Sequence, residues 1–370
     1  MKDRLYSTLR EVRTQLGLSQ QQLAERAGVS RQAITSIETG VNAPSTIVAL
    51  RLAKALGRRV EDLFKFEDES PTIEATPAQC GGPKHVGPVT LAQVDGRWIA
   101  HAADAESVPV DGKGEWVKGA DAMSVRILSD ECLHTPTIVV AGCAPALALW
   151  MRASERWHGN VRFHSVFANS TQALDALIGG EVHAAGIHLY NPETGEHNTP
   201  IVSRRIQGRE AVIVNLGIWN EGLFVRPGNP FRIKGVEDLA QPGVTIVNRE
   251  VGAGSRRVLD AALAHASLPS NQVTWIDRIA SSHLEVAQTV AFGHAEVGIG
   301  PEPVAARYGL DFIPLQEVRY DVVVWRDALD FEPLQMLMDT LSQRRMRAQL
   351  ELVGGFDTRL TGEVVGRLGG

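Results

Sequence analysis

Four short segments place glycine or hydroxyl residues where a helix is predicted to begin: GCAPA (142–146), ANST (168–171), REVGAGSR (249–256) and ASSH (280–283). Small residues at such a point let a ligand approach the backbone N–H groups, and the helix dipole there favours negative charge. One such turn is common, whereas four in one region indicate a shared anion-binding cleft. The alternative, four tight turns with a purely structural role, stays open.

The sequence lacks the motifs of common enzyme and cofactor sites. VGAGSRR is not the GxGxxG fingerprint with its acidic partner, and GxxxxGK[ST], GxSxG and HExxH do not occur. The 11 histidines are scattered, without pairs at metal-ligand spacing near a carboxylate. The three cysteines, Cys80, Cys132 and Cys143, form no CxxC and argue against a disulfide framework. We therefore predict no catalytic residue, no metal site and no cofactor.

From Thr137 onward, predicted strands alternate with predicted helices. The strands include TIVVAG, VRFHSVF, EVHAAGIHL, VTIVNRE, VTWIDR, AEVGIG and DFIPL, and helices such as STQALDALIGG and GSRRVLDAALAHA lie between them. This rhythm predicts an α/β fold with parallel strands and helices on both faces of the sheet. In such folds, ligands bind where strand C-termini meet helix N-termini.

The first 65 residues are predicted to be helical and basic. Helices are expected over 3–16, 20–27, 30–38 and 45–57, the last with Ile47, Leu50, Ala53 and Leu56 on one face, and a short fifth helix over 60–64. Residues 1–64 hold ten Lys/Arg and six Asp/Glu, a balance of +4, and the remainder holds 27 and 37, a balance of −10. A small basic N-terminal region, which we call the head, followed by an acidic remainder fits a protein in which the head alone contacts phosphate groups.

The segment LSQQQLAERAGVSRQAITSIETG (18–40), followed by P-S, L-x-x-A-x-A-L and V-x-x-L-F, resembles the Xre family of helix-turn-helix domains, the phage-repressor type. The resemblance implies that a homodimer binds double-stranded operator DNA and that Arg13 pairs structurally with Glu38. It assigns the DNA contacts to Gln20, Ser30, Arg31, Gln32, Thr35 and Ser36. A fold used only for protein contacts is the alternative.

Residues 137–365 resemble a type 2 periplasmic-binding-protein domain of the molybdate-like branch, found fused to Xre-type heads and to molybdopterin-biosynthesis proteins. The matching phrases are VAGCAPAL, ALIGGEVHAAGIHL, NREVGAGSR, SSHLEVAQTVAFGHAEVGIG and GLDFIPLQEVRYDVVV. Where relatives often have GCDPAL and GSGTR, this chain has Ala144 in place of the aspartate, and GAGSR. The first change removes a carboxylate, and the second keeps a hydroxyl.

This second resemblance implies two lobes, 137–222 plus 318–370 and 223–317, joined by crossing strands. It assigns the ligand contacts to Cys143, Ala144, Asn169, Ser170, His188, Gly254, Ser255, Arg256, Ser282 and His283, with Glu302 and Tyr320 near the hinge. Simpler roles remain open: His188 as a core histidine, Cys143 as a packing residue, and Arg256 as the partner of a nearby carboxylate.

Taken together, the sequence predicts a multi-domain chain. We expect an all-α five-helix head over 1–65, a flexible linker over 66–85, a small β module over 86–134 with a hairpin at Asp95-Gly96, and a two-lobed α/β domain over 135–370.

The expected function is that of a one-component transcriptional regulator. It would sense a small anionic ligand, such as a molybdate- or tungstate-like oxyanion or a molybdopterin-related compound. The alternative is an enzyme or accessory protein of molybdenum cofactor metabolism with a DNA-binding head. No run approaches the ~18 apolar residues of a membrane span. The charged N-terminus, MKDRLYSTLREVR, is unlike a secretory signal, and the three cysteines argue against a disulfide framework, so we expect a cytoplasmic protein.

Overall fold

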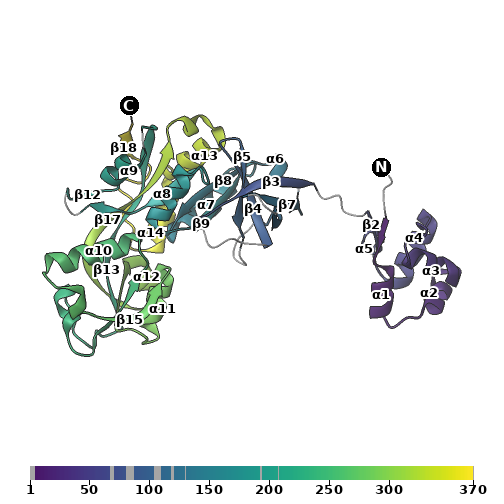
Figure 1. Ribbon diagram of the computed structural model, residues 1–370, viewed down its shortest axis with the longest axis horizontal. Helices are drawn as coiled ribbons and strands as arrows, with labels where there is room; N and C mark the ends of the chain where they lie inside the picture. Colours follow the sequence, from purple (N-terminus) through teal and green to yellow (C-terminus); the bar gives the residue numbers. More distant parts are fainter. Residues whose placement is uncertain are drawn as a thin grey trace. The chain divides into compact units, whose positions relative to one another are not determined.

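The structure is a computed structural model that describes residues 5–66, 71–80, 87–103, 110–117, 121–129, 131–191, 194–206 and 208–369 (Figure 1). The chain divides into two compact units, Met1–Pro71 and Thr72–Gly370. The predicted linker over 66–85 crosses this boundary. Its residues 67–70 and 81–86 lie outside the described residues, whereas Thr72–Pro77 form a strand, β3, in place of the expected flexible chain.

The first unit is built from short helices around one apolar core. Ser19 and Ser30 begin the second and third helices by accepting hydrogen bonds from Gln22 N and Ala33 N, and Gly28 turns the chain between them with φ of 64°. The helices are α1 (Leu9–Gln15), α2 (Gln20–Ala27), α3 (Arg31–Glu38), α4 (Thr46–Leu56) and α5 (Val60–Leu63).

Two expectations for this unit are wrong. The first helix begins at Leu9, not at residue 3, because β1 (Leu5–Ser7) pairs antiparallel with β2 (Phe64–Phe66), so the unit is not entirely helical. The buried face of α4 also differs from the predicted stripe. Ala53 and Leu56 are buried as predicted, but Ala49 and Leu52 complete the buried face, while Ile47 and Leu50 are 65% and 57% exposed.

The second unit begins with a small closed β-barrel. Its strands are β3 (Thr72–Pro77), β4 (Gly87–Val94), β5 (Arg97–Ala102), β6 (Gly112–Trp116) and β7 (Met123–Ile127), arranged β3-β5-β4-β6-β7. The predicted hairpin is present. Asp95 and Gly96, with φ of 47° and 76°, join β4 to β5, as a tight two-residue turn with two positive φ values requires.

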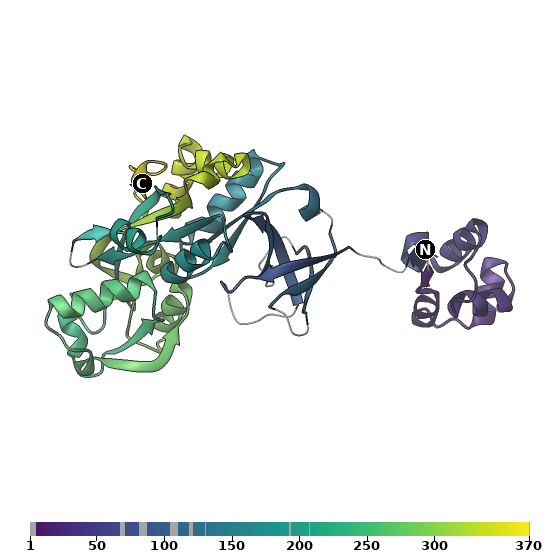
Figure 2. The same cartoon turned by 45° about the horizontal axis from the view of Figure 1, so that its top comes forward.

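The barrel lies beside the α/β domain (Figure 2), and its Ala92, Val94 and Ile99 belong to an apolar cluster shared with that domain. Glu181 accepts hydrogen bonds from the N–H groups of Gln79 and Cys80, both at 3.0 Å. A buried ion pair of 2.7 Å joins Asp111 of the barrel segment to Arg162. The small β module predicted over 86–134 is therefore joined to the α/β domain as part of one compact unit.

The α/β domain is organised by one large mixed sheet. In the described residues its strand order is β15-β14-β16-β13-β17-β10-β8-β9, and β18 pairs with β13. The strands are β8 (Thr137–Gly142), β9 (Arg162–Phe167), β10 (Ala184–Ile187), β13 (Ala211–Val225), β14 (Thr245–Arg249), β15 (Thr274–Ala280), β16 (Val297–Pro301), β17 (Asp311–Trp325) and β18 (Val364–Leu368).

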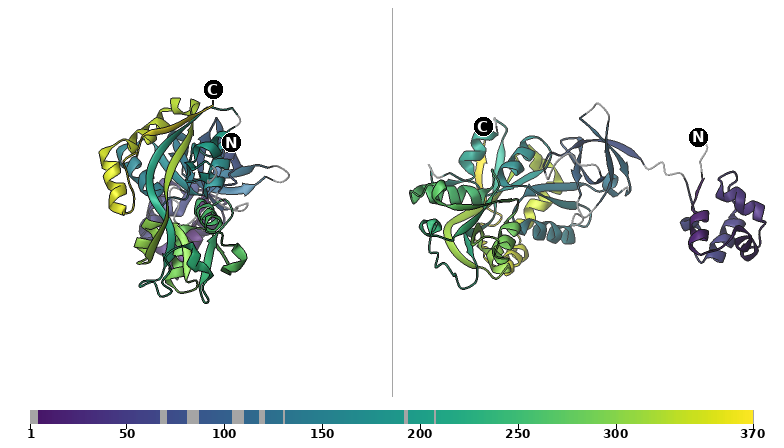
Figure 3. Two further views of the ribbon diagram at one scale, coloured as in Figure 1. Left: turned by 90° about the vertical axis from the view of Figure 1, so that its left-hand side faces the viewer. Right: turned by 60° about the horizontal axis from the view of Figure 1, so that its bottom comes forward.

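Two long antiparallel strands, β13 and β17, run from one half of this sheet to the other (Figure 3). One half, lobe one, contains β8, β9, β10 and β18, and the other, lobe two, contains β14, β15 and β16. The predicted lobe boundaries at 222/223 and 317/318 fall inside these two strands. Register shifts interrupt their pairing at Asn215/Gly217 and at Glu221/Gly222.

Helices cover both faces of the sheet, and buried apolar clusters lie under them in each lobe. None of the described helices is long and apolar enough to cross a membrane. The remaining elements are α6 (Glu131–His134), α7 (Ala146–Trp157), α8 (Ser170–Ile178), β11 (Tyr190–Asn191), β12 (Glu196–His197), α9 (Thr199–Arg205), α10 (Gly254–His265), α11 (His283–Ala291), α12 (Glu302–Arg307), α13 (Glu332–Leu341) and α14 (Arg344–Val353), with 3-10 turns at Val236–Ala240, Ser270–Gln272 and Asp327–Asp330.

Candidate functional site

Helix α3 presents polar side chains on the surface of the head. Arg31, Gln32 and Thr35 are exposed, and Arg31 and Gln32 make no side-chain hydrogen bond to any residue that the structure describes. Ser30 is held as the cap of α3, and Ser36 accepts a hydrogen bond of 2.8 Å from Asn42. The two long, uncommitted side chains are therefore the ones available for DNA bases, since Arg and Gln pair with guanine and adenine edges respectively.

An ion pair in the head's interior fixes α3 against α1. The Arg13 guanidinium donates to both carboxylate oxygens of Glu38, at 2.6 and 3.1 Å, so the pairing predicted from the family resemblance is present. Gln20 donates to the same carboxylate at 2.8 Å and accepts from Thr35. Burial opposes ionisation of Glu38, but these hydrogen bonds outweigh it and hold its pKa below the ordinary value. Gln20, predicted as a phosphate contact, has its side chain engaged here.

Replacing Glu38 with alanine should destabilise the head by about 1.5–3 kcal/mol, because it removes the charge-assisted hydrogen bonds of the partly buried Arg13 guanidinium. All seven tryptophans follow residue 71, so their fluorescence does not report on the head. Hydrogen exchange of residues 9–63 in the full chain is the appropriate measurement. Glu25→Ala, at an exposed position of α2, is the control and should cost at most about 0.5 kcal/mol. Equal protection in both variants would contradict the assignment.

In the α/β domain, buried polar side chains from both lobes meet where strands end and helices begin. Lobe one contributes Cys143, directly after β8, Ser170 at the start of α8, and His188, directly after β10. The Sγ atom of Cys143 lies 3.6 Å from Nδ1 of His188. Ser170 Oγ accepts a hydrogen bond of 3.1 Å from the backbone N–H of His188. Tyr320 of β17 accepts from the N–H of Cys143 at 3.2 Å.

Lobe two contributes an arginine, a serine and a histidine to the same region. Arg249, the last residue of β14, is fully buried and bonds both carboxylate oxygens of Glu250, at 2.8 and 3.0 Å. Its Nη1 lies 2.9 Å from Nδ1 of His283, the first residue of α11. Ser255 of α10 donates to Glu221 of β13. We call this set the interlobe cluster: Cys143, Ser170, His188, Tyr320, Glu221, Arg249, Ser255 and His283.

Burial controls the charge of the interlobe cluster. It raises the pKa of the Cys143 thiol to about 12, so this cysteine is not a thiolate nucleophile as it stands. Burial, and then the charge of Arg249, lower the pKa of His188 to about 3 and that of His283 well below its ordinary value. Burial raises the pKa of Glu221 to about 7, although Ser255 and Trp219 donate to it.

The raised pKa of Glu221 makes a testable contribution to stability. The pKa of Glu221 rises from its ordinary value of 4.5 to about 7 in the folded chain. At a pH between these two values, the folded chain therefore retains a proton that the unfolded chain has released. Stability from this group is therefore present below pH 4.5 and is lost as the pH rises toward 7. Because Glu221→Gln cannot ionise, it should gain up to about 3 kcal/mol over the wild type between pH 5 and pH 8. Denaturant midpoints of both proteins at the two pH values test this, and parallel pH profiles would refute it.

The structure brings most, but not all, of the predicted ligand contacts together. Cys143, Ala144, Ser170, His188, Gly254, Ser255 and His283 lie in or directly beside the interlobe cluster. Asn169 and Ser282 serve as caps of α8 and α11. Arg256 lies 3.7 Å from Asp260 and donates to the carbonyl of Arg249, so it takes the simpler role that the sequence analysis left open. Glu302 accepts from Asn220 at 3.1 Å, outside the cluster.

Arg249 and Glu221, the arginine and the carboxyl group of the cluster, were not predicted from the sequence. Each had a signal. Arg249 ends the apolar run VTIVNR, and Glu221 is the single acid in AVIVNLGIWNEGLFV. An ionisable side chain in such an apolar run needs a polar partner when it is buried. The shift of register beside Glu221 accords with the frequent placement of β-bulges next to binding sites.

A helix-turn-helix head and a two-lobed α/β domain with a buried polar cluster define the class: a DNA-binding module fused to a binding-protein-like module. Family models agree, matching the helix-turn-helix family over residues 9–63 and the PBP superfamily domain over residues 151–342. The chain belongs to the PBP superfamily, with a fused N-terminal helix-turn-helix domain of Xre type.

Relatives match each part of the chain. YvgK of Bacillus subtilis is 33% identical over 199 residues, 54% of this chain and 64% of YvgK, so this chain spans just under two thirds of that relative. A protein from the 5′ region of a 2Fe-2S ferredoxin gene of Clostridium pasteurianum is 33% identical over 112 residues, 30% of this chain and 99% of that protein. An HTH-type transcriptional regulator of Methanothermobacter thermautotrophicus is 50% identical over 62 residues, 16% of this chain and 90% of the relative.

Among solved structures, the sulfate-binding protein SubI of Mycobacterium tuberculosis covers 60% of this chain and 86% of its own, with 15% identity and a TM-score of 0.48. A resemblance at this level does not bear on the ligand. The relatives with matching heads are named as HTH-type transcriptional regulators. This chain thus combines a helix-turn-helix domain with a PBP superfamily domain.

Proposed function

We propose that the protein is a one-component transcriptional regulator that binds operator DNA as a homodimer and senses a small anionic ligand between the lobes. The observation that carries the proposal is that one chain holds both an exposed, uncommitted Arg31–Gln32 pair on α3 and a buried polar cluster drawn from two lobes. A DNA-binding protein of this kind acts in the cytoplasm.

The surface of the head supports a dimer on DNA. Ile47 and Leu50 of α4 are largely exposed although both are apolar, and they lie one helical turn apart on the same face. Apolar side chains grouped on a small domain favour contact with a second copy. Two recognition helices about one turn of DNA apart would then bind a pseudo-palindromic site.

Of the four helix starts, the start of α10 is the best suited to bind an anion. Asn169 and Ser282 already accept first-turn N–H groups of α8 and α11, and Tyr320 accepts the N–H groups of Cys143 and Ala144 before α7. Within the described residues, no side chain caps α10, which begins at Gly254 beside His188. Its free N–H groups, its dipole and the neighbouring charge of Arg249 favour a negative ligand.

Contacts between the lobes provide a means of switching. Asn169 donates to the carbonyl of Val251 at 3.4 Å, and Thr171 donates to that of Gly252 at 3.1 Å. A ligand that bonds to both lobes favours this closed arrangement over a separated one. To regulate transcription, it must bind one arrangement more tightly, since a ligand shifts an equilibrium only by its difference in affinity for the two states.

The test is calorimetry of the full chain against molybdate, tungstate, sulfate and phosphate and a pterin, together with operator selection from a random DNA library. We expect saturable binding of one of these ligands and enrichment of a two-fold symmetric site. A molybdate- or tungstate-like oxyanion is the leading candidate, from the family resemblance. Failure of the library to enrich any sequence would overturn the DNA-binding part, and absence of heat with every ligand would overturn the anion part.

A further inference from the structure

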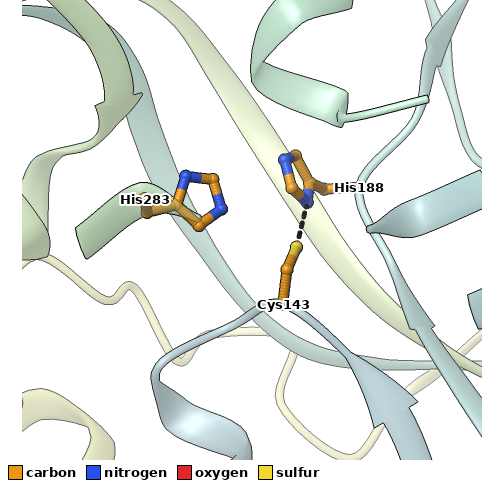
Figure 4. A group of neighbouring side chains, drawn as sticks. All are labelled: Cys143, His188 and His283. Atoms are coloured by element: carbon orange, nitrogen blue, oxygen red, sulfur yellow. Dashed lines mark hydrogen bonds between the residues drawn. The ribbon is translucent and has the colours of Figure 1, made fainter. Parts of the chain in front are cut away.

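Three side chains of metal-ligating type converge inside the interlobe cluster (Figure 4). Cys143, His188 and His283 come from three different elements, and one ligand atom from each lies within 4.8 Å of the other two. The Cys143 Sγ to His188 Nδ1 separation is 3.6 Å. A tetrahedral zinc ion with bonds of about 2.3 Å to sulfur and about 2.0 Å to nitrogen holds two such ligands roughly 3.5 Å apart.

Two imidazole nitrogens in this group have no other role among the described residues. Nε2 of His188 and Nε2 of His283 are buried and find no hydrogen-bond partner in the part of the chain that the structure describes. Both residues are only 3% exposed. Buried polar atoms are normally paired, so two orphaned nitrogens in one place indicate an additional group there.

We propose that Cys143, His188 and His283 bind one transition-metal ion of the zinc type, leaving a fourth position for the anionic ligand. A thiolate with two imidazoles favours such ions over magnesium or calcium, which take oxygen ligands. Three protein ligands with an open position is also the arrangement that zinc adopts when it binds a small molecule. The fourth-position ligand rests on the proposed function, whereas metal binding itself does not.

The site is arranged to join the two lobes. Cys143 and His188 belong to lobe one, and His283 begins α11 in lobe two. An ion held by all three is a bond across the lobes, so metal binding stabilises the closed arrangement. Ser170 Oγ accepts a hydrogen bond of 3.1 Å from the backbone N–H of His188, which holds that residue beside Cys143.

The guanidinium of Arg249 opposes metal binding, because it is positively charged and lies beside the ring of His283. Arginine only donates, so Nδ1 of His283 accepts from Nη1 at 2.9 Å and, in the neutral ring, Nε2 carries the proton. When the ion takes Nε2, that proton moves to Nδ1, which donates to Ser255 Oγ, 3.4 Å away, and the guanidinium shifts. The thiol of Cys143 loses its proton to water. Arg249 retains both bonds to Glu250.

Cobalt(II) is the probe, because a thiolate bound to cobalt gives a charge-transfer absorption. Titrating the purified full chain with cobalt should give one ion per chain and this band. Cys143→Ser should abolish the band, and His188→Ala or His283→Ala should lower cobalt affinity by more than about 100-fold, beyond the 10- to 100-fold typical of outer-shell changes. Cys80→Ser is the matched control, since Cys80 is also buried, and should leave the band intact.

Arg249→Met adds a readout that general destabilisation would not give, since removal of the opposing donor should tighten cobalt binding. A missing band in the wild-type chain, or an unchanged band in Cys143→Ser, would overturn the metal site. Operator affinity is measured in the same samples, with and without oxyanion. If oxyanion alters operator affinity but cobalt does not bind, the metal site fails and the proposed function stands. If cobalt binds as described but neither cobalt nor oxyanion alters operator affinity, the metal site stands and its effector role fails.

Discussion

Replacing Arg31 and Gln32 together with alanine should lower affinity for a selected operator by about 100- to 1,000-fold. Both side chains are exposed at the start of α3 and uncommitted among the described residues. A good bidentate contact to a base edge is worth about 1–3 kcal/mol, and two such contacts are worth about 3–4 kcal/mol if each is of middling strength. The measurement is a titration of labelled operator with the full chain, repeated with a scrambled site of equal length.

The control for this prediction is Arg26→Ala, which removes one positive charge from the head at an exposed position of α2. It should weaken binding to operator and scrambled DNA alike, because a lost phosphate contact carries no sequence information. The double variant should lose the distinction between the two DNAs. Retained discrimination by Arg31→Ala/Gln32→Ala would show that another element reads the bases.

Replacing Gly254 with alanine should prevent the lobes from closing and abolish the ligand response. Gly254 is the first residue of α10, and a Cβ atom there would fall on the backbone carbonyl and ring of His188 in lobe one. A backbone neighbour cannot rotate away, so we expect a cost of at least about 1–3 kcal/mol, typical of overpacking, in the closed arrangement. Ligand affinity should fall by about 10-fold or more. Calorimetry with the ligand identified for the wild type measures this.

Gly159→Ala is the matched control, since a Cβ atom there meets no heavy atom within 4 Å. It should bind ligand as the wild type does. Because Gly254 belongs to the second unit and the head has its own core, Gly254→Ala should still bind operator DNA. Wild-type ligand affinity in Gly254→Ala would mean that contact between α10 and His188 is not needed for binding.

Local signals allowed much of the fold to be predicted. The caps Ser19 and Ser30 and the left-handed Gly28 lie within one short stretch, so the two helices of the DNA-binding motif and their turn could be located from residue types alone. The hairpin at Asp95-Gly96 has an equally local cause. The alternation of strands and helices in the α/β domain follows from hydrophobic period and turn residues.

The failures share a different cause, which is pairing between distant segments. Residues 5–7 have a helical pattern but pair with Phe64–Phe66, so the first helix begins later than its pattern predicts. The face of α4 that is buried depends on which helices it packs against, and periodicity cannot choose between two apolar faces. Linker composition did not reveal β3, because its partners β5 and β7 come later in the chain.

The same reason limited the prediction of the site. Helix starts can be recognised locally, which is why Ser170, Gly254 and Ser255, predicted as ligand contacts, could be singled out from the sequence and lie in or beside the interlobe cluster. The neighbours of Arg249 and Glu221 depend on strand order, because β13 and β14 both flank β16 in the sheet. Cys143, His188 and His283 are distant in sequence, so the sequence analysis expected no metal ligands, whereas the structure places the three side chains together.

The central claim is that ligand binding between the lobes controls DNA binding by the head. The most direct measurement is operator affinity of the full chain across a titration of its ligand, for the wild type and Gly254→Ala side by side. We expect operator affinity to change by about 5- to 150-fold in the wild type, the usual range of allosteric coupling, and almost not at all in the variant. Operator affinity that stays constant as the wild type saturates with ligand would contradict this claim.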